Sequence, residues 1–406
     1  MTDYVLLPKI QHELPEIHLL TLEEFKQRRD MIESFQSGPC GMDYEANNWD
    51  YIDPDFKVRT VGLSNDQYTV SIDLKGANEG DMYSFKKWLW LSELEYVAHN
   101  VSFEAGASTR LFGSYGNPIA DTYVLFADLA TEYRRSWSLD TAMSDLLGLT
   151  KEGDKVKDHM KANKWTWADI DEFDFEILGR YNAIDAYGHW ALYKYFQKIV
   201  DSYKDTWGAY YWDYHQNDCM RMVLMEVEAR LGGIYVDTEE LEKSYEELTT
   251  GRDETMEAFL GDPEIAPHIK TFNEECVAEV IAAEPPKLTK TGKVTARYTK
   301  WLDKVEAAKK EQHFNTNSTQ QLRWLFFDMM RLPVVEYTEK GEPSTAKDVL
   351  AKLGKPGQLL LKYREYVTKL KFVTQLREGT NGGKIHPSVR VFGTLSSRST
   401  AGKLEA

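Results

Sequence analysis

Cysteine is scarce in this sequence, which has only Cys40, Cys219 and Cys276 among its 406 residues. The three lie far apart and form no C-x-x-C pair, so neither a zinc site nor a disulfide framework is predicted. Cysteines used in this way are typical of proteins in a reducing compartment, and we therefore expect a cytoplasmic protein.

Long apolar segments are also missing. No run approaches the roughly 20 apolar residues that a membrane-spanning helix needs, so we expect no membrane partner. The first residues, MTDYVLLPKI, lack the basic and then apolar order of a signal peptide. What remains is a chain with 42% apolar and 13% aromatic residues, which is enough for sizeable cores in about two or three domains.

The chain has no overall excess of positive charge. Its net charge of −16 argues against a nucleic-acid partner when averaged over the whole chain, but local patches decide binding. From Lys347 to Ala406 there are twelve Lys or Arg residues and only four Asp or Glu residues. This basic stretch is either a surface for a phosphate backbone or an ordinary solvated face.

The first half of the chain alternates between helix-like and strand-like segments. Residues 21–36 are predicted to form a helix, in which Thr21 and Glu24 supply a capping box. A short opening strand is followed by two more, at 58–64 and 68–74. Three strands in succession predict the antiparallel edge of a mixed sheet.

The part of the chain after about residue 206 is predicted to be mainly helical. A helical pattern over 215–260 is interrupted at Gly232 and Gly233. A further helix is expected after a cap near Ser318. Residues from about 260 to 312 are rich in charge, and we interpret them as a solvated excursion with no assigned chemistry.

Two acids, Asp43 and Glu45, stand one residue apart in the stretch GMDYEA. On a strand, both carboxylates would project from the same face. Carboxylates that face the same way repel unless a divalent cation lies between them, and hard oxygen ligands suit Mg²⁺ or Mn²⁺. The alternative is two solvated acids in a loop, because the same spacing recurs at Asp174/Glu176, Asp237/Glu239 and Asp262/Glu264.

Two later segments carry further candidate side chains. In YVAHNVSFEAGAS a short strand meets His99 and Asn100, and Glu104 then opens a helix. His99 and Asn100 are either substrate contacts or ordinary turn and capping residues. In a later helical segment, Tyr181 and Asp185 stand four residues apart and share one face. A buried tyrosine beside an acid is often a structural hydrogen bond, which stays the alternative for this pair.

In chain order, GMDYEA, HNVSFE and YNAID resemble the three exonuclease motifs of the DnaQ-like 3′–5′ exonucleases, in the subclass whose third motif carries a tyrosine. The later segment MEVEARLGGIYVD resembles the helix before the thumb of the family A DNA polymerases, the bacterial polymerase I and phage replicative type. Successive segments of the thumb in these polymerases are resembled by FNTNSTQQL, EYTEKGEPST and YREYVTKLKFVTQL. KIHPSVRVFGTLSSRST resembles the entry to their palm. The resemblance covers nearly the whole chain, least well at 1–36 and 260–312.

The resemblance implies an α/β RNase H-like exonuclease domain with a mixed sheet, followed by a mainly α-helical thumb domain. It implies a proofreading nuclease of DNA replication, located in the host cytoplasm if a phage encodes it. Its partners would be the single-stranded 3′ end and the primer-template duplex of DNA. The expected segments are an N-terminal segment at 1–36, the exonuclease domain at 37–205, the thumb at 206–378 with the charged excursion at about 260–312, and the start of a palm at 379–406.

The same resemblance implies roles for individual residues. Two Mg²⁺ or Mn²⁺ ions would be held by four acids, namely Asp43, Glu45, Glu104 and Asp185. Tyr181 would orient the attacking water. The frayed 3′ terminus would meet His99, Asn100 and Phe103, although core packing is the alternative for Phe103. Duplex DNA would meet Ser318, Lys369 and Lys371, together with Arg398 at the place of the family's T-G-R arginine.

The second motif departs from the family pattern. It ends in Glu104 where the family has Asp, and Ala46 stands where the family commonly has Thr. One extra methylene can still reach a metal ion, but it can also shift the ion, and small misplacements lower rates by orders of magnitude. The alternative function is therefore an exonuclease-inactive DNA-binding and assembly subunit of the polymerase.

A further departure is that the sequence stops before the palm and fingers motifs. The expectation is a truncated polymerase, or one subunit of a polymerase split between two polypeptides, whose partner chain carries the palm and fingers. No nucleotide incorporation is expected from this chain alone. A third possibility, an RNA-trimming nuclease of the RNase D sort, is disfavoured by the thumb-like segments.

Overall fold

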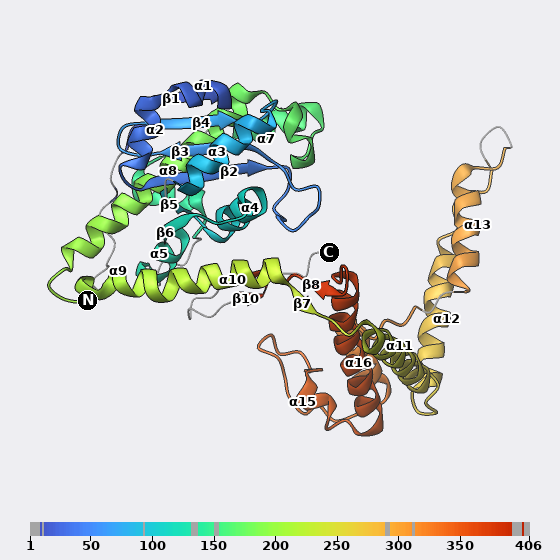
Figure 1. Ribbon diagram of the computed structural model, residues 1–406. Coiled ribbons are helices and arrows are strands. Elements are labelled where there is room, and N and C mark those ends of the chain that lie inside the picture. The colour runs from blue at the N-terminus through green and yellow to red at the C-terminus, as the bar shows by residue number, and fades with distance from the viewer. Residues whose placement is uncertain are drawn as a thin grey trace. The chain divides into compact units, whose positions relative to one another are not determined.

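The computed structural model describes most of the chain, namely Lys9 and residues 12–91, 94–130, 137–149, 154–288, 293–310, 313–391 and 400–401. It divides into two compact units. The first comprises Met1–Tyr235 and Gly379–Ala406, and the second comprises Val236–Glu378. Figure 1 shows the sheet of the first unit and the helices of the second. The predicted domain boundaries stay a prediction.

The first unit is built on a six-stranded mixed sheet with the order β1-β4-β3-β2-β5-β6. The pairs β2–β3 and β3–β4 are antiparallel, as predicted, whereas β1, β5 and β6 each pair in parallel with a neighbour. The antiparallel strands do not form the edge, because β1, which the sequence analysis missed, pairs outside β4. The six strands are Ile17–Thr21, Cys40–Ala46, Val58–Ser64, Thr69–Asp73, Glu95–Ala98 and Asn117–Asp121.

The strand order reverses at β2. From β2 the chain builds outward through β3 and β4, and then returns to the other side of β2 to form β5 and β6. β2 and β5 pair only at Cys40–Tyr96 and Gly41–Val97. The remainder of β2 therefore borders a crevice at the point where strand order switches, which is where open α/β sheets bind ligands.

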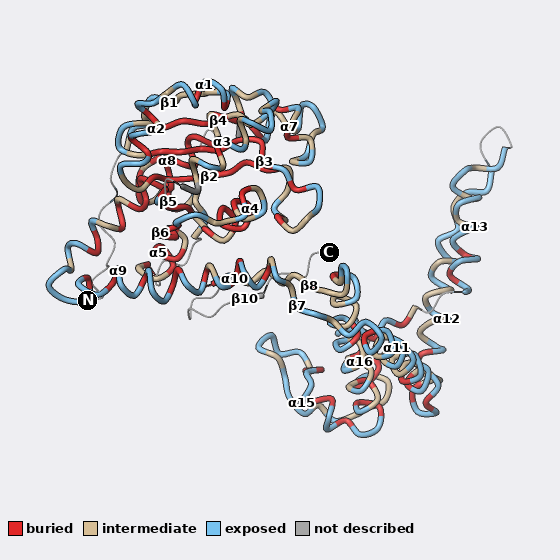
Figure 2. Tube along the Cα trace, viewed as in Figure 1, coloured by how far each residue is buried: buried red, intermediate tan, exposed pale blue. Residues whose placement is uncertain are grey.

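The two faces of the sheet differ in chemistry. On one face Met42 and Tyr44 of β2 join an apolar cluster with β3, β4 and four helices, and Figure 2 shows this buried layer in red. These helices are α1 (Leu22–Gln27), α2 (Arg29–Gln36), α3 (Glu79–Leu91) and α4 (Ser102–Phe112). Because side chains alternate along a strand, the opposite face carries small and polar residues, including Gly41, Asp43, Glu45, Thr60, Gly62 and Ser71.

Helix α8 (Phe175–Ser202) lies across this polar face and contacts β2, β3 and β4. Two glycines permit the close approach. A Cβ at Gly41 would lie 2.1 Å from the carbonyl oxygen of Ala186, and one at Gly62 would lie 2.8 Å from that of Asn182. The sheet therefore brings the middle of α8 directly over the two acids of β2.

The helix predicted at 21–36 is present but broken. The capping box is confirmed, because Thr21 and Glu24 exchange the expected hydrogen bonds. Arg28 departs from helical geometry, with φ −90° and ψ 74°, and separates α1 from α2. The break lets Phe25 and Phe35 both pack into the same apolar cluster.

The remaining elements of the first unit are further helices and two short two-stranded ribbons. Helix α5 (Thr122–Leu129) follows β6, and a long helical segment ends at Gly232, as predicted. Two short ribbons close the unit, pairing β7 with β8 and β9 with β10. The other bounds are α6 Leu139–Ala142, η1 Met143–Leu147, α7 Asp154–Asn163, η2 Trp167–Glu172, α9 Gly208–Tyr214, η3 His215–Met220, α10 Arg221–Gly232, β7 Ile234–Tyr235, β8 Lys384–Ile385, β9 Val389–Arg390 and β10 Thr400–Ala401.

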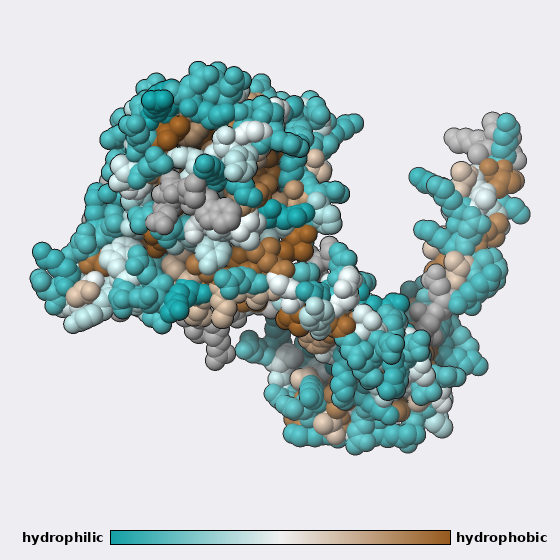
Figure 3. Space-filling view, viewed as in Figure 1, coloured by the Kyte–Doolittle hydropathy of each residue, from teal (hydrophilic) through white to brown (hydrophobic). Residues whose placement is uncertain are grey.

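The second unit is mainly helical, as predicted. Its two longest helices, α11 (Thr238–Leu260) and α16 (Gly354–Glu378), pack side by side. Helices α12 and α13 form a pair on which hydrophilic and hydrophobic residues intermingle (Figure 3), with Ile281 and Leu302 exposed. The other bounds are α12 Ala266–Ala282, α13 Ala296–Ala308, α14 Thr319–Arg323, η4 Trp324–Met329 and α15 Lys347–Leu350.

Candidate metal centre

Three of the predicted acids meet in the first unit. Oxygen atoms of Asp43, Glu45 and Asp185 lie within 4.8 Å of one another, and all three side chains are buried. The alternation of β2 brings Asp43 and Glu45 to one face, and the close approach of α8 brings Asp185 to them. Three buried carboxylates this close repel unless a cation neutralises them, and their hard oxygen atoms fit Mg²⁺ or Mn²⁺.

The fourth predicted acid, Glu104, lies in the same cleft but outside this close group. Glu104 is 3% exposed, and no residue that the structure describes forms a hydrogen bond with its Oε2. Burial raises the pKa of Glu104 well above its ordinary value, and the negative charge of Asp43 raises it further. A buried carboxylate oxygen without a hydrogen bond favours either a proton or a cation, so Glu104 also fits a metal-binding role.

Tyr181 lines the cleft beside the acids. Burial raises its pKa far above the ordinary value, and the charges of Asp185, Glu45 and Asp43 act in the same direction. Its hydroxyl is therefore protonated at neutral pH and can donate a hydrogen bond, but it cannot act as a base.

The turn after β5 holds the predicted residues His99 and Asn100. Asp121, which caps α5, accepts backbone N–H groups from Asn100 at 2.9 Å and from Val101 at 3.0 Å. Burial raises the pKa of Asp121 to about 6, while these backbone hydrogen bonds act against that shift. Nε2 of His99 donates to the carbonyl of Trp137 at 2.7 Å. The buried carboxylate of Asp121 thus holds the turn in place, and the sequence analysis did not assign Asp121 to the site.

Aromatic side chains form the wall of the cleft. The ring of Phe103 lies 5.1 Å from that of Trp49, whose side chain is 71% exposed. Phe103 itself is buried, which supports the core-packing alternative for its role. The predicted site did not include Trp49, although Trp49 follows the first motif by only three residues. Strand β2 ends at Ala46, so the alternation of its side chains could not predict which way the side chain of Trp49 points.

The cleft also contains a cation that the sequence analysis missed. Arg390, in the short strand β9, lines the cleft together with the acids. Its guanidinium carbon lies 5.8 Å from the centre of the Tyr123 ring. About two hundred residues separate Arg390 from the last exonuclease-like motif, YNAID, so no local pattern could have identified it.

The predicted duplex contacts belong to the second unit, apart from Arg398, which lies outside the described residues. The Ser318 hydroxyl accepts the backbone N–H of Gln321 at 3.3 Å and caps α14, as predicted. Lys369 pairs with Glu365 at 2.7 Å, and Lys371 is exposed. The roles of these residues in DNA binding stay predictions.

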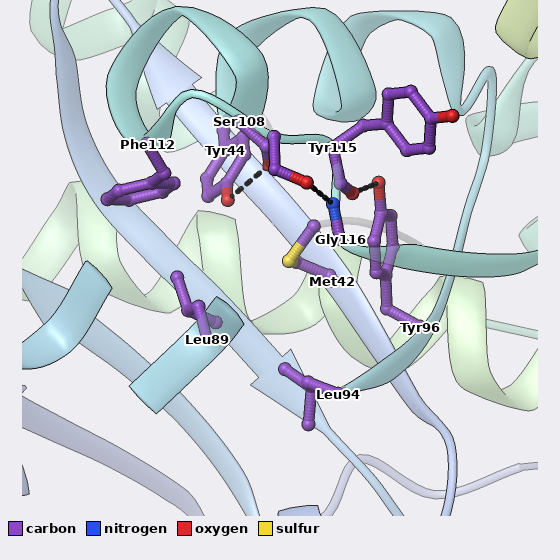
Figure 4. Close-up of a pocket in the computed structure, with 10 residues that line it drawn as sticks. Met42, Tyr44, Leu89, Leu94, Tyr96, Ser108, Phe112, Tyr115 and Gly116 are labelled. Atoms are coloured by element: carbon purple, nitrogen blue, oxygen red, sulfur yellow. Dashed lines mark hydrogen bonds between the residues drawn. The ribbon is translucent and has the colours of Figure 1, made fainter. Parts of the chain in front are cut away.

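A second, smaller cavity lies on the apolar face of β2 (Figure 4) and does not belong to the site. Its volume is about 20 Å³, and Met42, Tyr44 and Phe112 are among its lining residues. None of its described lining residues is charged. The Tyr44 hydroxyl shares a hydrogen bond of 2.8 Å with Ser108 beside it. A cavity of this size is a packing gap that holds at most one water.

Two family models match the chain. Residues 21–201 match the 3′–5′ exonuclease model, and residues 287–403 match the DNA polymerase family A model. The first match contains every acid of the cleft.

None of the helices that the structure describes combines the length and apolar character needed to cross a bilayer.

Individual relatives point the same way. A DNA polymerase of Bacillus phage SP01 is 26% identical over 370 residues, which are 84% of this chain and 38% of that protein. DNA polymerase I of Pseudomonas aeruginosa is 38% identical over 98 residues, covering 21% of this chain and 11% of that protein. The fold is similar to the POL domain of Pol1 from M. smegmatis in a complex with DNA primer-template and dNTP. That likeness has a TM-score of 0.62 and 15% identity, and it covers 92% of this chain and 53% of that one. The chain thus spans less than two thirds of the length of each of these three proteins.

Proposed function

We propose that this chain, which belongs to the family A DNA polymerases with a 3′–5′ exonuclease domain, removes nucleotides from DNA 3′ ends as a proofreading nuclease. The observation that carries the proposal is the buried acid group of Asp43, Glu45 and Asp185 inside the segment that matches the exonuclease model. The RNase H-like classification of the sheet and the thumb identity of the second unit are parts of the same proposal.

The four acids would hold two divalent ions. Asp43, Glu45 and Asp185, whose oxygen atoms lie close together, would hold one of them, and Glu104 in the same cleft would help to hold the other. Bound there, Mg²⁺ or Mn²⁺ supplies a water nucleophile at neutral pH and stabilises the leaving 3′ oxygen. Tyr181, held in its protonated form beside Asp185, would donate a hydrogen bond that orients the attacking water.

The wall of the cleft would bind the single-stranded terminus. The exposed ring of Trp49, supported from behind by Phe103, offers a surface on which a base can stack. His99 and Asn100 would contact the terminal nucleotide, and Arg390 would meet a phosphate. Because four acids line the site, a cation at its edge would offset the repulsion between the protein and the DNA backbone.

The second unit would hold duplex DNA through phosphate contacts, which position DNA without reading its sequence. Ser318, Lys369 and Lys371 are the proposed contacts, with Arg398 near the primer end. None of the matches described above supports the predicted second polypeptide with palm and fingers, so this partner stays a prediction. The cytoplasmic location stays a prediction as well.

A labelled-DNA assay tests the proposal. Single-stranded DNA that carries a label at its 5′ end is incubated with the protein and Mg²⁺, and the products are separated by length. We expect stepwise shortening from the 3′ end that disappears with EDTA and in Asp43→Ala. Glu33→Ala removes an exposed acid of α2 outside the cleft and serves as the matched control, with unchanged shortening.

Three other outcomes are informative. Shortening that persists in Asp43→Ala would contradict the proposed site. An inactive wild type that gains activity on Glu104→Asp would instead support the assembly-subunit alternative, in which the longer side chain has disabled the nuclease. A preference for RNA over DNA ends would favour the RNA-trimming alternative.

A further inference from the structure

A row of three residues crosses the polar face of the sheet beneath α8. In the strand register, Asp43 of β2 pairs with Gly62 of β3, and Gly62 pairs with Ser71 of β4. The row therefore reads acid, gap, hydroxyl. Asn182 of α8 lies over the gap, since a Cβ at Gly62 would come within 3.0 Å of both amide atoms of Asn182.

Asn182 connects the two ends of this row. Its Nδ2 donates to the Oδ2 of Asp43 at 2.8 Å and to the backbone carbonyl of Asp43 at 3.1 Å. Its Oδ1 accepts the hydroxyl of Ser71 at 2.7 Å. The side chains of Asn182 and Ser71 are fully buried, so these bonds form without competition from water.

The chemistry of the partners fixes the orientation of the amide. Both atoms of Asp43 that face Asn182 are acceptors when the carboxylate is ionised, so the NH₂ group must point toward them. The amide oxygen then faces Ser71, whose hydroxyl must donate. The amide of Asn182 is thus held at both ends, by Asp43 and by Ser71, and its hydrogen bond restrains the carboxylate plane of Asp43.

We propose that Asn182, held in place by Ser71 and given room by Gly62, is a positioning residue that orients Asp43 for divalent-ion binding. A neutral amide suits this task because it stabilises the carboxylate while leaving its negative charge to attract an ion, whereas Lys or Arg would neutralise that charge. The inference rests on the proposed function, because it assigns Asn182 a role toward the divalent ion that Asp43 would help to hold.

Mn²⁺ affinity, measured by calorimetry on the full chain without DNA, tests the role. Loss of a partner that orients a metal ligand commonly weakens metal binding about 10- to 100-fold, and we expect a loss of this size in Asn182→Ala. Ser71→Ala, which touches no acid directly, should weaken binding in the same direction by a smaller factor. Exonuclease kcat should fall in parallel with Mn²⁺ affinity, while the KM for DNA changes little.

Ser64→Ala is the matched control. Ser64 and Thr69 share a buried hydroxyl hydrogen bond of 2.8 Å between the same two strands, β3 and β4. Ser64→Ala therefore removes a comparable buried bond away from Asp43, and it should leave Mn²⁺ affinity unchanged. Any general loosening of the sheet would affect both serine variants alike.

The outcomes separate this inference from the function on which it rests. If the wild type binds no Mn²⁺, the proposed metal centre fails. If the wild type binds Mn²⁺ and Asn182→Ala binds it equally well, only the role of Asn182 is overturned. If circular dichroism shows that Asn182→Ala does not fold, the Mn²⁺ affinity of Ser71→Ala tests the role of Asn182 instead. Weakened Mn²⁺ binding in folded Ser71→Ala supports the inference, and unchanged binding contradicts it.

Discussion

The carboxyl of Glu104 is buried beside that of Asp43, and after burial itself the charge of Asp43 is the largest contribution that raises the pKa of Glu104. The two acids come from different elements, α4 and β2, which meet only in the folded chain. Without a cation, Glu104 is favoured in its protonated form. A divalent ion would reverse that preference, so ion binding should release a proton and stabilise the fold.

This relationship predicts a pH dependence of stability in the metal-free protein. The native state keeps the proton of Glu104 to a higher pH than the unfolded chain, whose glutamate pKa is near 4.5. The free energy of unfolding should therefore fall as pH rises from about 4.5 toward the raised pKa. Urea denaturation at several pH values in EDTA measures this slope.

Glu104→Gln should flatten the slope without abolishing it, because Asp121, with its pKa raised to about 6, contributes in the same direction. Saturating Mn²⁺ should also reduce the slope in the wild type. Equal slopes in the wild type and Glu104→Gln would show that Glu104 does not have the raised pKa assigned to it.

Tyr181→Phe should lower kcat without a large change in the KM for DNA. The substitution keeps the ring but removes the hydroxyl, and misplacement of a reacting group commonly costs about 100-fold in rate. Because burial and Asp185 keep this tyrosine protonated, the variant should retain the pH profile of the wild type. A lost alkaline limb in the variant would instead indicate that Tyr181 titrates during the reaction.

Trp49→Ala should weaken the binding of single-stranded DNA. Stacking of a base on an aromatic ring is worth about 1–3 kcal/mol, so KM should rise roughly 5- to 150-fold. Trp49 is mostly exposed, and its removal should barely affect stability. Tyr210→Ala, which removes another exposed aromatic residue outside the cleft, should leave KM unchanged. Equal effects of the two variants would show that the cleft wall does not bind the substrate.

Ser318 has two predicted roles that can be separated. Ser318→Ala should lower the free energy of unfolding by about 1 kcal/mol, because the cap of α14 is lost. Ser318→Asp should keep the cap but place a negative charge where a phosphate is predicted, so duplex DNA should bind more weakly at equal stability. Unchanged duplex affinity in Ser318→Asp would leave Ser318 with the capping role alone.

Several features of the fold followed from local sequence. The capping box of Thr21 and Glu24 needs only residues three apart, and the shared face of Asp43 and Glu45 needs only the alternation of a strand. The end of the long helical segment was likewise predicted from Gly232 and Gly233, which interrupt the helical pattern. The three consecutive strands were predicted because turn residues separate them in sequence.

The features that the sequence did not reveal depend on contacts between distant segments. The edge strand β1 is defined by its pairing with β4, about fifty positions later. The hydrogen bonds of Asn182 to Asp43 join residues 139 positions apart, and Arg390 reaches the cleft from another part of the chain. The break at Arg28 reflects how α1 and α2 pack on the sheet, which overrides helix periodicity.

A crystal structure with Mn²⁺ and a short oligothymidylate would test the metal centre most directly, since the anomalous signal of Mn²⁺ locates each ion independently of the protein model. The account predicts ions coordinated by Asp43, Glu45 and Asp185, with a second position at Glu104, beside the 3′-terminal phosphodiester. Mn²⁺ bound elsewhere, or a 3′ terminus that lies away from these acids, would contradict it.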